Sequence, residues 1–335
     1  MEELTEGVRA VLCEDGDLTL TSVPGGASRE TWLVQGERER WVLRRDPVGS
    51  LSLVPIAEEF ALIDLARAAG VRVPEPIALE PAGGRFGSAG MLMSFVQGTS
   101  VAPRILRKPE FDVARSKLTA QLAEALARIH SIDPEVLEGV LPPRETGGSS
   151  ASPAEPLRST DPAFAQISEW ERQLDEIGEP LPTVELGLRW LRANAPVPAE
   201  LRLVHGDFRL GNFIVDADGL AAVIDWELAH LGDPAEDIGW LCIRSWRFGN
   251  DDRRVAGIGD LDEFVAAYEA AGGAPVDRDR VRYWEAFGNA KWAVICARQA
   301  HDHLRGMRRS HELASLGRRI CEPEWDLLEL MKEAA

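Results

Sequence analysis

The sequence is poor in cysteine. Only 4 of its 335 residues are cysteines. They lie far apart, without any Cys-x-x-Cys pair, at Cys13, Cys242, Cys296 and Cys321. This pattern excludes a cysteine-based zinc site and a disulfide framework. We therefore expect the protein in a reducing compartment, the cytoplasm.

Basic residues are also few relative to acidic ones. Lys and Arg number 37 against 55 Asp and Glu, which gives a formal net charge of -18. Proteins that bind nucleic acid or an anionic membrane surface by charge present basic patches, so we expect neither partner. The negative charge would suit a cationic substrate, but general solubility explains it equally well.

Long apolar runs are missing. No run approaches the roughly 20 residues of a membrane-spanning helix, and the first 17 residues, MEELTEGVRAVLCEDGD, lack a positively charged start followed by an apolar core. We therefore expect a soluble chain without a signal peptide. Its length allows two domains or one large bilobed unit.

The first ninety residues are dominated by strand patterns. β-rich runs at 18–23, 30–36 and 40–46 predict three strands, and residues 88–98 predict a further one. One helix is expected near 55–69, because Ile56, Phe60 and Ile63 recur at helical spacing. We expect it to be the only helix before residue 92.

The pattern becomes helical after residue 110. Predicted helices include one marked by Leu118, Leu122, Leu126 and Ile129, two near 162–177 and 183–194, and those that follow Asp233. Residues 142–158 are rich in Pro, Gly and Ser and predict a loop. Together the two patterns predict an α+β fold, with an antiparallel-sheet lobe over 1–96, a hinge near 93–98 and a mainly helical lobe over 97–335.

A polar stretch interrupts the helical part. LVHGDFRLGNFIVD, residues 203–216, lies between short predicted strands, and the turn at 216–219 leads into a third strand, 221–225, to form a hairpin. We expect this hairpin to bring Asp207, Asn212 and Asp225 together. Asp and Asn oxygens suit Mg²⁺, and one carboxylate would remain for proton transfer. This combination of groups is what phosphoryl transfer requires.

Three motifs here resemble a known family. HGDFRLGN (205–212), VIDWE (223–227) and GDPAEDIGW (232–240) are similar, in order and spacing, to motifs of the aminoglycoside/choline-kinase-like phosphotransferases. The resemblance implies a bilobed protein-kinase-like fold and the transfer of the γ-phosphate of ATP, with Mg²⁺, to a hydroxyl of a small molecule. It makes Asp207 the catalytic base, Asn212 and Asp225 the Mg²⁺ ligands, and Arg209 a catalytic cation near the γ-phosphate.

The similarity extends upstream to a nucleotide site. GGASRETWLV (25–34) resembles a hairpin that covers the nucleotide, WVLRR (41–45) resembles the strand that carries a phosphate-binding lysine, and MLMSFVQG (91–98) resembles the hinge. The cofactor-binding residues implied are Gly26, Ser28, Val42, Arg44, Glu59, Met93, Ser94, Phe95 and Val96. Val42 would contact adenine, and Glu59 would pair with Arg44.

Arg44 departs from the family pattern, which has lysine at this position. Arginine binds phosphate bidentately where lysine acts as a point charge, so a nucleotide-binding pseudokinase with a regulatory role is the alternative. Intact Asp207, Asn212 and Asp225 favour an enzyme.

The acceptor is left open. Amino-sugars suit the acidic charge, whereas VLRRDP, GNFIVD, DWELAHLGDP and WRFG resemble the kinase domains fused to some acyl-CoA dehydrogenases. That branch implies a hydroxyacyl metabolite, for example a CoA thioester. Trp246 and Phe248 are expected either in the acceptor pocket or in the core. The sequence does not predict an oligomeric state.

Overall fold

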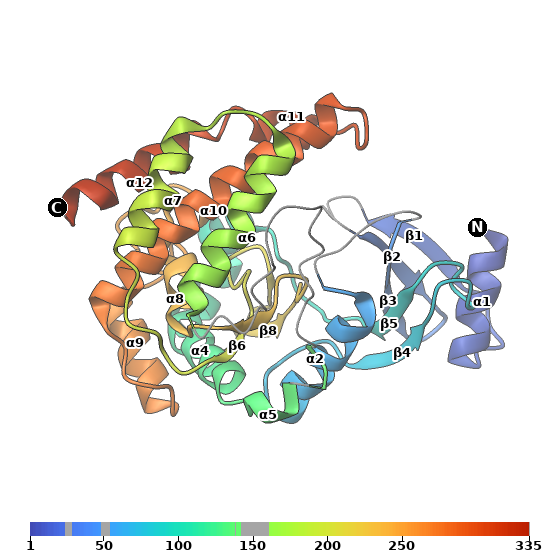
Figure 1. The fold of residues 1–335 in the computed structure, drawn as a ribbon. Helices are drawn as coiled ribbons and strands as arrows, with labels where there is room; N and C mark the ends of the chain where they lie inside the picture. The colour runs from blue at the N-terminus through green and yellow to red at the C-terminus, as the bar shows by residue number, and fades with distance from the viewer. Residues whose placement is uncertain (24–28, 48–53, 138, 142–160, 335) are drawn as a thin grey trace.

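The computed structural model describes residues 1–23, 29–47, 54–137, 139–141 and 161–334. Within these ranges the chain forms a five-stranded sheet near its N-terminus and a larger, mainly helical part (Figure 1). The turn predicted at 25–28 and the loop predicted at 142–158 fall outside the described residues.

The N-terminal sheet is antiparallel throughout. Its strands, in the spatial order β1-β2-β3-β5-β4, are β1 (Thr19–Val23), β2 (Glu30–Gln35), β3 (Arg40–Arg45), β5 (Gly90–Ser94) and β4 (Pro76–Glu80). Each neighbouring pair runs antiparallel. The strands predicted at 18–23, 30–36, 40–46 and 88–98 are confirmed, and β4 completes the sheet.

Two helices cover opposite faces of this sheet. Helix α2 (Ile56–Ala68) packs Ile56 and Ile63 into one core with Met91 and Met93 of β5. On the other face lies a second core that includes Leu92 of β5. Since successive side chains of a strand point to opposite faces, the alternation of Met91, Leu92 and Met93 separates the two cores.

The second core contains a helix that was not predicted. Helix α1 (Glu2–Leu12) buries Leu4 and Val8 against Trp41 and Leu43. The expectation of a single helix before residue 92 was therefore wrong. Leu4, Val8 and Val11 recur at helical spacing and the first turn is acidic, both of which favour a helix. The local signal for α1 was therefore present and was missed, whereas the sheet face that it covers is visible only in the folded structure.

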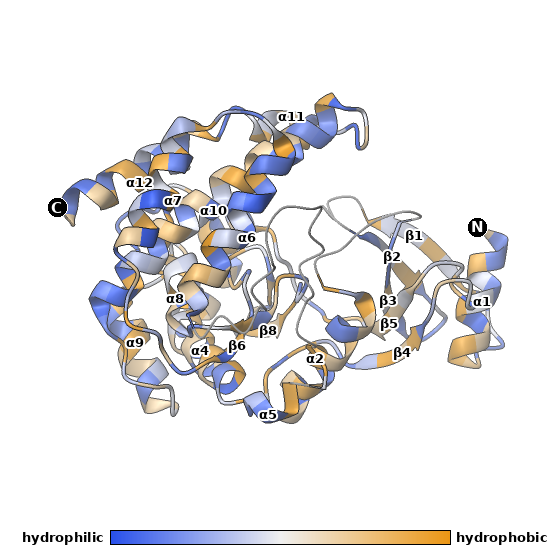
Figure 2. Cartoon of the chain, viewed as in Figure 1, coloured by the Kyte–Doolittle hydropathy of each residue, from blue (hydrophilic) through white to orange (hydrophobic). Residues whose placement is uncertain are grey.

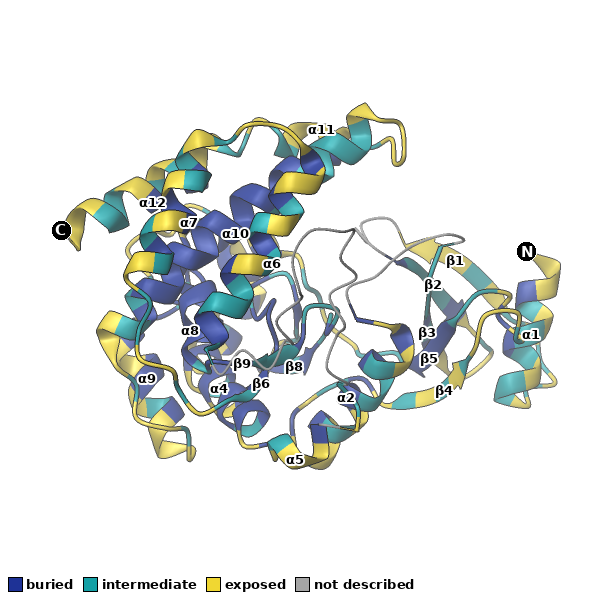
Figure 3. Cartoon of the chain, in the orientation of Figure 1, coloured by how far each residue is buried: buried dark blue, intermediate teal, exposed yellow. Residues whose placement is uncertain are grey.

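The helical part is arranged around one long, buried helix. Its described helices are α3 (Ala102–Arg107), η1 (Pro109–Phe111), α4 (Asp112–His130), α5 (Pro134–Leu137), α6 (Pro162–Ile177), α7 (Pro182–Ala193), α8 (Ala235–Cys242), η2 (Arg244–Trp246), α9 (Leu261–Ala270), α10 (Arg278–Leu304), α11 (His311–Leu316) and α12 (Cys321–Glu333). Helix α10 has 27 residues and is mostly buried, as is α8 beside it (Figure 3). The predicted helices near 162–177 and 183–194 are confirmed as α6 and α7.

The outer helices are amphipathic. Helices α1, α11 and α12 carry hydrophilic and hydrophobic residues in alternation (Figure 2), as expected for helices that turn one face to solvent. No helix in the described ranges combines the length and apolar character needed to cross a lipid bilayer.

Two short strand pairs lie within the helical part. Strands β7 (Phe213–Val215) and β8 (Leu220–Val223) form the predicted hairpin. Strand β6 (Arg202–Val204) pairs with β9 (His230–Gly232), which was not predicted. The connector from β5 joins the hairpin directly, because Thr99 and Val215 exchange two backbone hydrogen bonds of 2.9 Å.

Candidate active site

The site is built on a sharp turn after β6. Gly206 has a φ of 77°, and a Cβ at this position would overlap the carbonyl oxygen of Leu228. Glycine adopts this φ without strain and has no Cβ to overlap Leu228, so it is the residue that fits this turn. The turn places His205 on the buried side, where its Nδ1 accepts a hydrogen bond of 3.2 Å from the amide of Asp207.

Asp237 of α8 is hydrogen-bonded to the backbone of the turn. Its carboxylate accepts hydrogen bonds from the amides of His205 at 2.8 Å and Gly206 at 2.9 Å, and it also lies 3.2 Å from Nε2 of His130. Burial alone would raise the pKa of Asp237, but the hydrogen bonds and charges of His130 and His205 together lower it. A charged, buried carboxylate therefore fixes the backbone that carries Asp207.

Three donors surround the carboxylate of Asp207. Its Oδ1 accepts from Nε1 of Trp240 at 2.9 Å and from Nε of Arg209 at 2.9 Å. Its Oδ2 accepts from Nδ2 of Asn212 at 2.5 Å. The side chain of Asp207 is 11% exposed, so it reaches the surface of the site while its orientation is fixed from three sides.

Arg209 lies beside the predicted base. Besides its bond to Asp207, its guanidinium stacks 4.5 Å from the ring centre of Trp246. Trp246 is buried and packs between Trp240 and Trp292, so it belongs to the core, whereas Phe248 lines a cavity described below. The structure thus brings Asp207, Arg209 and Asn212 together.

Asp225 adopts a left-handed backbone. It follows β8 with a φ of 71°, a conformation that Asp tolerates better than most residues. Its Oδ1 lies 2.7 Å from Nη2 of Arg44, whose Nη1 lies 2.5 Å from Oε1 of Glu59. Burial alone would raise the pKa of Asp225, but Arg44 and the charge of Arg209 lower it. The predicted pair of Arg44 and Glu59 is present.

A buried residue that sequence reasoning missed completes this network. Arg29 is 3% exposed and contacts Glu59, Oδ1 of Asp46 at 2.8 Å and the carbonyl of Val54 at 2.5 Å. In sequence it stands in a polar turn, where an arginine is normally solvated, so no local signal distinguished it. The amide of Trp226 donates to Glu59 at 3.3 Å and ties this network to the helical part.

The structure describes some, but not all, of the other residues predicted to bind the nucleotide. Val42 and Met93 are register partners on β3 and β5. The amides of Ser94 and Phe95 already donate to the carbonyls of Glu75 at 2.9 Å and Arg40 at 3.2 Å, so neither amide is available to a ligand as the chain stands. Val96 follows in the connector. Gly26 and Ser28 lie outside the described residues.

Two oxygen donors in the site fit Mg²⁺. Nδ2 of Asn212 donates both to Oδ2 and to the backbone oxygen of Asp207, which turns Oδ1 of Asn212 away from that carboxylate. Asp225 supplies an ionised carboxylate. Mg²⁺ commonly takes one or two protein ligands and completes its shell with water and substrate phosphates. In the described residues no group of three or more His, Cys, Asp or Glu is arranged to hold a metal.

Comparison with known proteins identifies the family. Residues 19–284 match the model of the phosphotransferase enzyme family. Acyl-CoA dehydrogenase family member 10 of Mus musculus is 26% identical over 329 residues, which cover 93% of this chain but 29% of that protein. An aminoglycoside 3'-phosphotransferase of Niallia circulans is 30% identical over 172 residues, covering 51% and 58%. The chain thus spans less than a third of the acyl-CoA dehydrogenase relative.

Solved structures share the fold. A Ralstonia eutropha JMP134 protein assigned as an aminoglycoside phosphotransferase aligns with a TM-score of 0.73 at 23% identity, covering 98% of both chains. A spectinomycin phosphotransferase in complex with ADP and spectinomycin aligns with a TM-score of 0.60 at 13% identity, covering 99% and 96%. The predicted α+β, bilobed kinase-like fold is confirmed. The chain belongs to the phosphotransferase enzyme family.

Proposed function

We propose that the protein transfers the γ-phosphate of ATP to a hydroxyl group of a small molecule. One observation carries the proposal: Asp207 and Asn212 are hydrogen-bonded to each other, while Arg44 links Asp225 to Glu59. The two sets adjoin each other, because the amide of Ile224, next to Asp225, donates to the carbonyl of Asn212 at 2.9 Å. The residues proposed as base, metal ligands and phosphate-binding cation therefore lie close together, and phosphoryl transfer works mainly by positioning and charge stabilisation.

The proposed step is a direct displacement at the γ-phosphorus. The acceptor oxygen forms a bond to the γ-phosphorus, the bond between that phosphorus and the oxygen of the departing ADP breaks, and the hydroxyl proton passes to Asp207. Mg²⁺, held by Asn212 and Asp225, would neutralise charge on the phosphates. Arg209, whose Nε is bonded to Asp207, is proposed to turn its remaining guanidinium nitrogens toward the γ-phosphate.

We place the nucleotide between the sheet and the helical part. Val42 and Met93 would face adenine, Gly26 and Ser28 would cover the phosphates, and Arg44 would contact them. Residues 93–98 are proposed as a hinge between lobes 1–96 and 97–335, and the carbonyls of Ser94 and Phe95 and the backbone of Val96 as adenine contacts. Structural relatives that carry AMP-PNP or ADP support ATP as the donor.

The pseudokinase alternative rests on Arg44 alone. It predicts that a lysine at this position would create activity that the wild type lacks. If the protein is an enzyme, Arg44→Met weakens ATP binding and Arg44→Lys has a milder effect, because a cation is kept beside Glu59 and Asp225. ATP titration and turnover of the two variants separate these cases.

We infer that the acceptor is a hydroxylated metabolite of hydroxyacyl type, with an amino-sugar as the second candidate. The acyl-CoA dehydrogenase family relatives support the first, and the Niallia circulans enzyme supports the second.

We propose that the protein is cytoplasmic. All four cysteines are among the described residues and are free thiols, which suits a reducing compartment.

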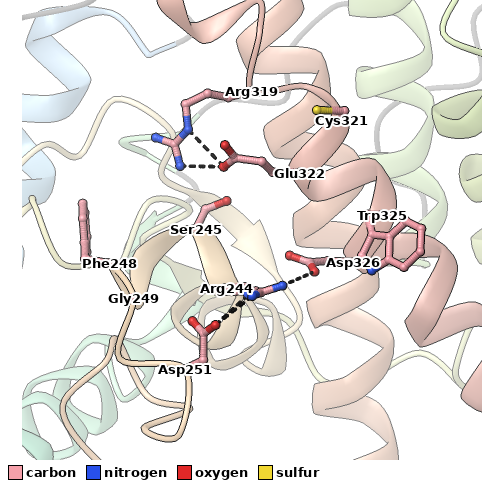
Figure 4. A pocket seen from close by; sticks show the side chains of 10 residues that line it. All are labelled: Arg244, Ser245, Phe248, Gly249, Asp251, Arg319, Cys321, Glu322, Trp325 and Asp326. Atoms are coloured by element: carbon pink, nitrogen blue, oxygen red, sulfur yellow. Dashed lines mark hydrogen bonds and ion pairs between the residues drawn. The ribbon is translucent and has the colours of Figure 1, made fainter.

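A cavity beside η2 is the proposed acceptor pocket (Figure 4). It has a volume of about 500 Å³ and lies between η2 and α12. Its lining includes Arg244 and Trp325. Nε of Arg244 donates a hydrogen bond of 2.9 Å to Asp251, and Trp325 is 63% exposed. Trp246, next to the lining residue Ser245, contacts Arg209. The pocket thus offers an aromatic surface and charges of both signs.

ADP release tests the function. Wild-type protein with ATP and Mg²⁺ is offered hydroxyacyl compounds, other hydroxylated metabolites and aminoglycosides, with Asp207→Asn as the matched control. We expect acceptor-dependent ADP release by the wild type only, and a phosphorylated acceptor by mass spectrometry. Absence of phosphate transfer to every acceptor in the panel would count against the enzyme and for the pseudokinase.

A further inference from the structure

A buried lysine lies behind the turn that carries Asp207. Lys291 of α10 is 2% exposed, and its ammonium group donates to the carbonyl of Gly206 at 2.7 Å. It also lies 3.5 Å from Oε1 of Glu236. A charged lysine is rarely buried to this degree unless it is paired, and here both its partners belong to the segments that form the site.

Lys291 also contacts the indole that binds Asp207. Its ammonium lies 4.6 Å from the ring centre of Trp240, within the range of a cation–π contact. Trp240 is 1% exposed, and its Nε1 donates to Oδ1 of Asp207 at 2.9 Å. One cation therefore supports both the backbone before Asp207 and the indole that holds the Asp207 carboxylate.

The contacts of Asp207 leave its two carboxylate oxygens with different capacities to accept further hydrogen bonds. Each carboxylate oxygen has about two lone-pair sites. Among the described residues, Oδ1 of Asp207 accepts from Trp240 and Arg209, whereas Oδ2 accepts from Asn212 alone. The one site left lies on Oδ2, so this oxygen is the one that can meet an acceptor hydroxyl.

We propose that Trp240, supported by Lys291, is a positioning residue that occupies Oδ1 of Asp207 and thereby presents Oδ2 to the acceptor hydroxyl. The inference rests on the proposed function, because it assigns a geometry to the proposed base. It identifies α8 and α10, which lie behind the site, as determinants of the rate of phosphate transfer and not of ATP binding.

Trp240→Phe tests the contact with little disturbance, since it keeps a ring over Lys291 and removes only the donor and part of the indole. Hydrogen bonds to charged groups contribute enough to change a rate by about 10- to 100-fold. We expect kcat to fall by that factor while KM for ATP stays within about twofold.

Trp292→Phe is the matched control. Trp292 is also buried, and its Nε1 has no hydrogen-bond partner among the described residues, so the same change removes no bond. We expect its kcat to stay near the wild-type value. Equal losses in Trp240→Phe and Trp292→Phe, or a wild-type kcat in Trp240→Phe, would overturn the inference.

A spectroscopic measurement tests the contact without an acceptor. The indole N–H resonance that disappears in Trp240→Phe belongs to Trp240. We expect it to move in Asp207→Ala and in Lys291→Met, and a resonance that stays in place in both would overturn the inference. Lys291→Met removes one of the two cationic partners of the buried Glu236 and leaves His230 at 3.0 Å as the other. Because losing a partner of a buried charge is destabilising, Lys291→Met with Glu236→Gln serves if the single variant does not fold.

The two proposals fail in different ways. An active wild type whose Trp240→Phe variant is equally active overturns only the positioning role. A wild type that transfers phosphate to no acceptor overturns the proposed function and, with it, the catalytic meaning of the Trp240 contact, whatever the indole resonance does.

Discussion

At the scale of single residues, we expect Asp207 to be required for phosphate transfer but not for nucleotide binding. If this carboxylate accepts the hydroxyl proton, Asp207→Asn keeps the size of the side chain but removes the base. General-base contributions are about 10²–10⁴-fold, so we expect turnover to fall by that factor and ATP affinity to change little. Turnover and calorimetric ATP binding of the same variant are the paired measurements.

The control for this variant lies in the neighbouring hairpin of β7 and β8. Asp218 is exposed in the turn between β7 and β8, so Asp218→Asn removes one negative charge without touching the site. We expect wild-type turnover from it. Near wild-type turnover from Asp207→Asn would show that Asp207 is not the base.

Asp225 should act on ATP binding only when the metal is present. Asp225→Ala removes a carboxylate that is expected to join Mg²⁺ to the phosphates, and we expect ATP affinity in Mg²⁺ to fall by at least about tenfold. With Mg²⁺ chelated, wild type and variant should bind ATP alike. Calorimetry with and without Mg²⁺ measures both, and equal wild-type affinity under the two conditions would contradict the assignment.

At the scale of elements, α1 stabilises the sheet through close contact. Gly7 lies so near the segment before β5 that a Cβ would overlap the backbone oxygen of Arg85. Backbone cannot yield as a flexible side chain does, so Gly7→Ala should displace α1 from Trp41 and Leu43. We expect a loss of about 1–3 kcal/mol in the free energy of unfolding, measured by urea denaturation.

Ala10→Gly offers a comparison in the same helix, because it lowers helix propensity by about 1 kcal/mol without an overlap. A Gly7→Ala variant as stable as the wild type would show that α1 is not packed as described.

At the scale of the whole molecule, the buried His205 and the half-buried His230 give stability opposite pH dependences. Burial lowers the pKa of His205, although Asp237 and Asp207 act against it. The unfolded chain then binds a proton that the folded chain does not, so stability should fall as pH falls through about 6.5. Burial would also lower the pKa of His230, but Glu236 raises it overall, and its stabilisation is lost as pH rises through the raised value.

His205→Asn isolates the first effect. We expect the wild type to lose more stability than His205→Asn between about pH 7.5 and about pH 5.5, within the range in which histidine titrates. His230→Gln should change the pH dependence in the opposite direction. Urea denaturation at the two pH values measures the differences, and parallel profiles for wild type and His205→Asn would refute the assignment.

Local patterns were sufficient where neighbours in sequence are also neighbours in space. The hairpin of β7 and β8 and the approach of Asn212 to Asp207 depend on a turn of a few residues, and both were predicted. The pair of Arg44 and Glu59, which the family resemblance implied, is present in the structure. The motif order from 205 to 240 indicated the family that residues 19–284 match.

The sequence by itself determined the antiparallel sheet, the helical part, the family and the polar turn at 205–212, because these follow from periodicity and from motifs with short spacing. Only the tertiary structure decided that α1 covers a sheet face, that β9 pairs with β6, that Arg29 is buried on Glu59 and that Lys291 supports Trp240. In each of these cases the partner lies far away in the chain. A charged side chain or a short apolar segment is buried only when the folded molecule provides the oppositely charged group or the apolar face that compensates for leaving water.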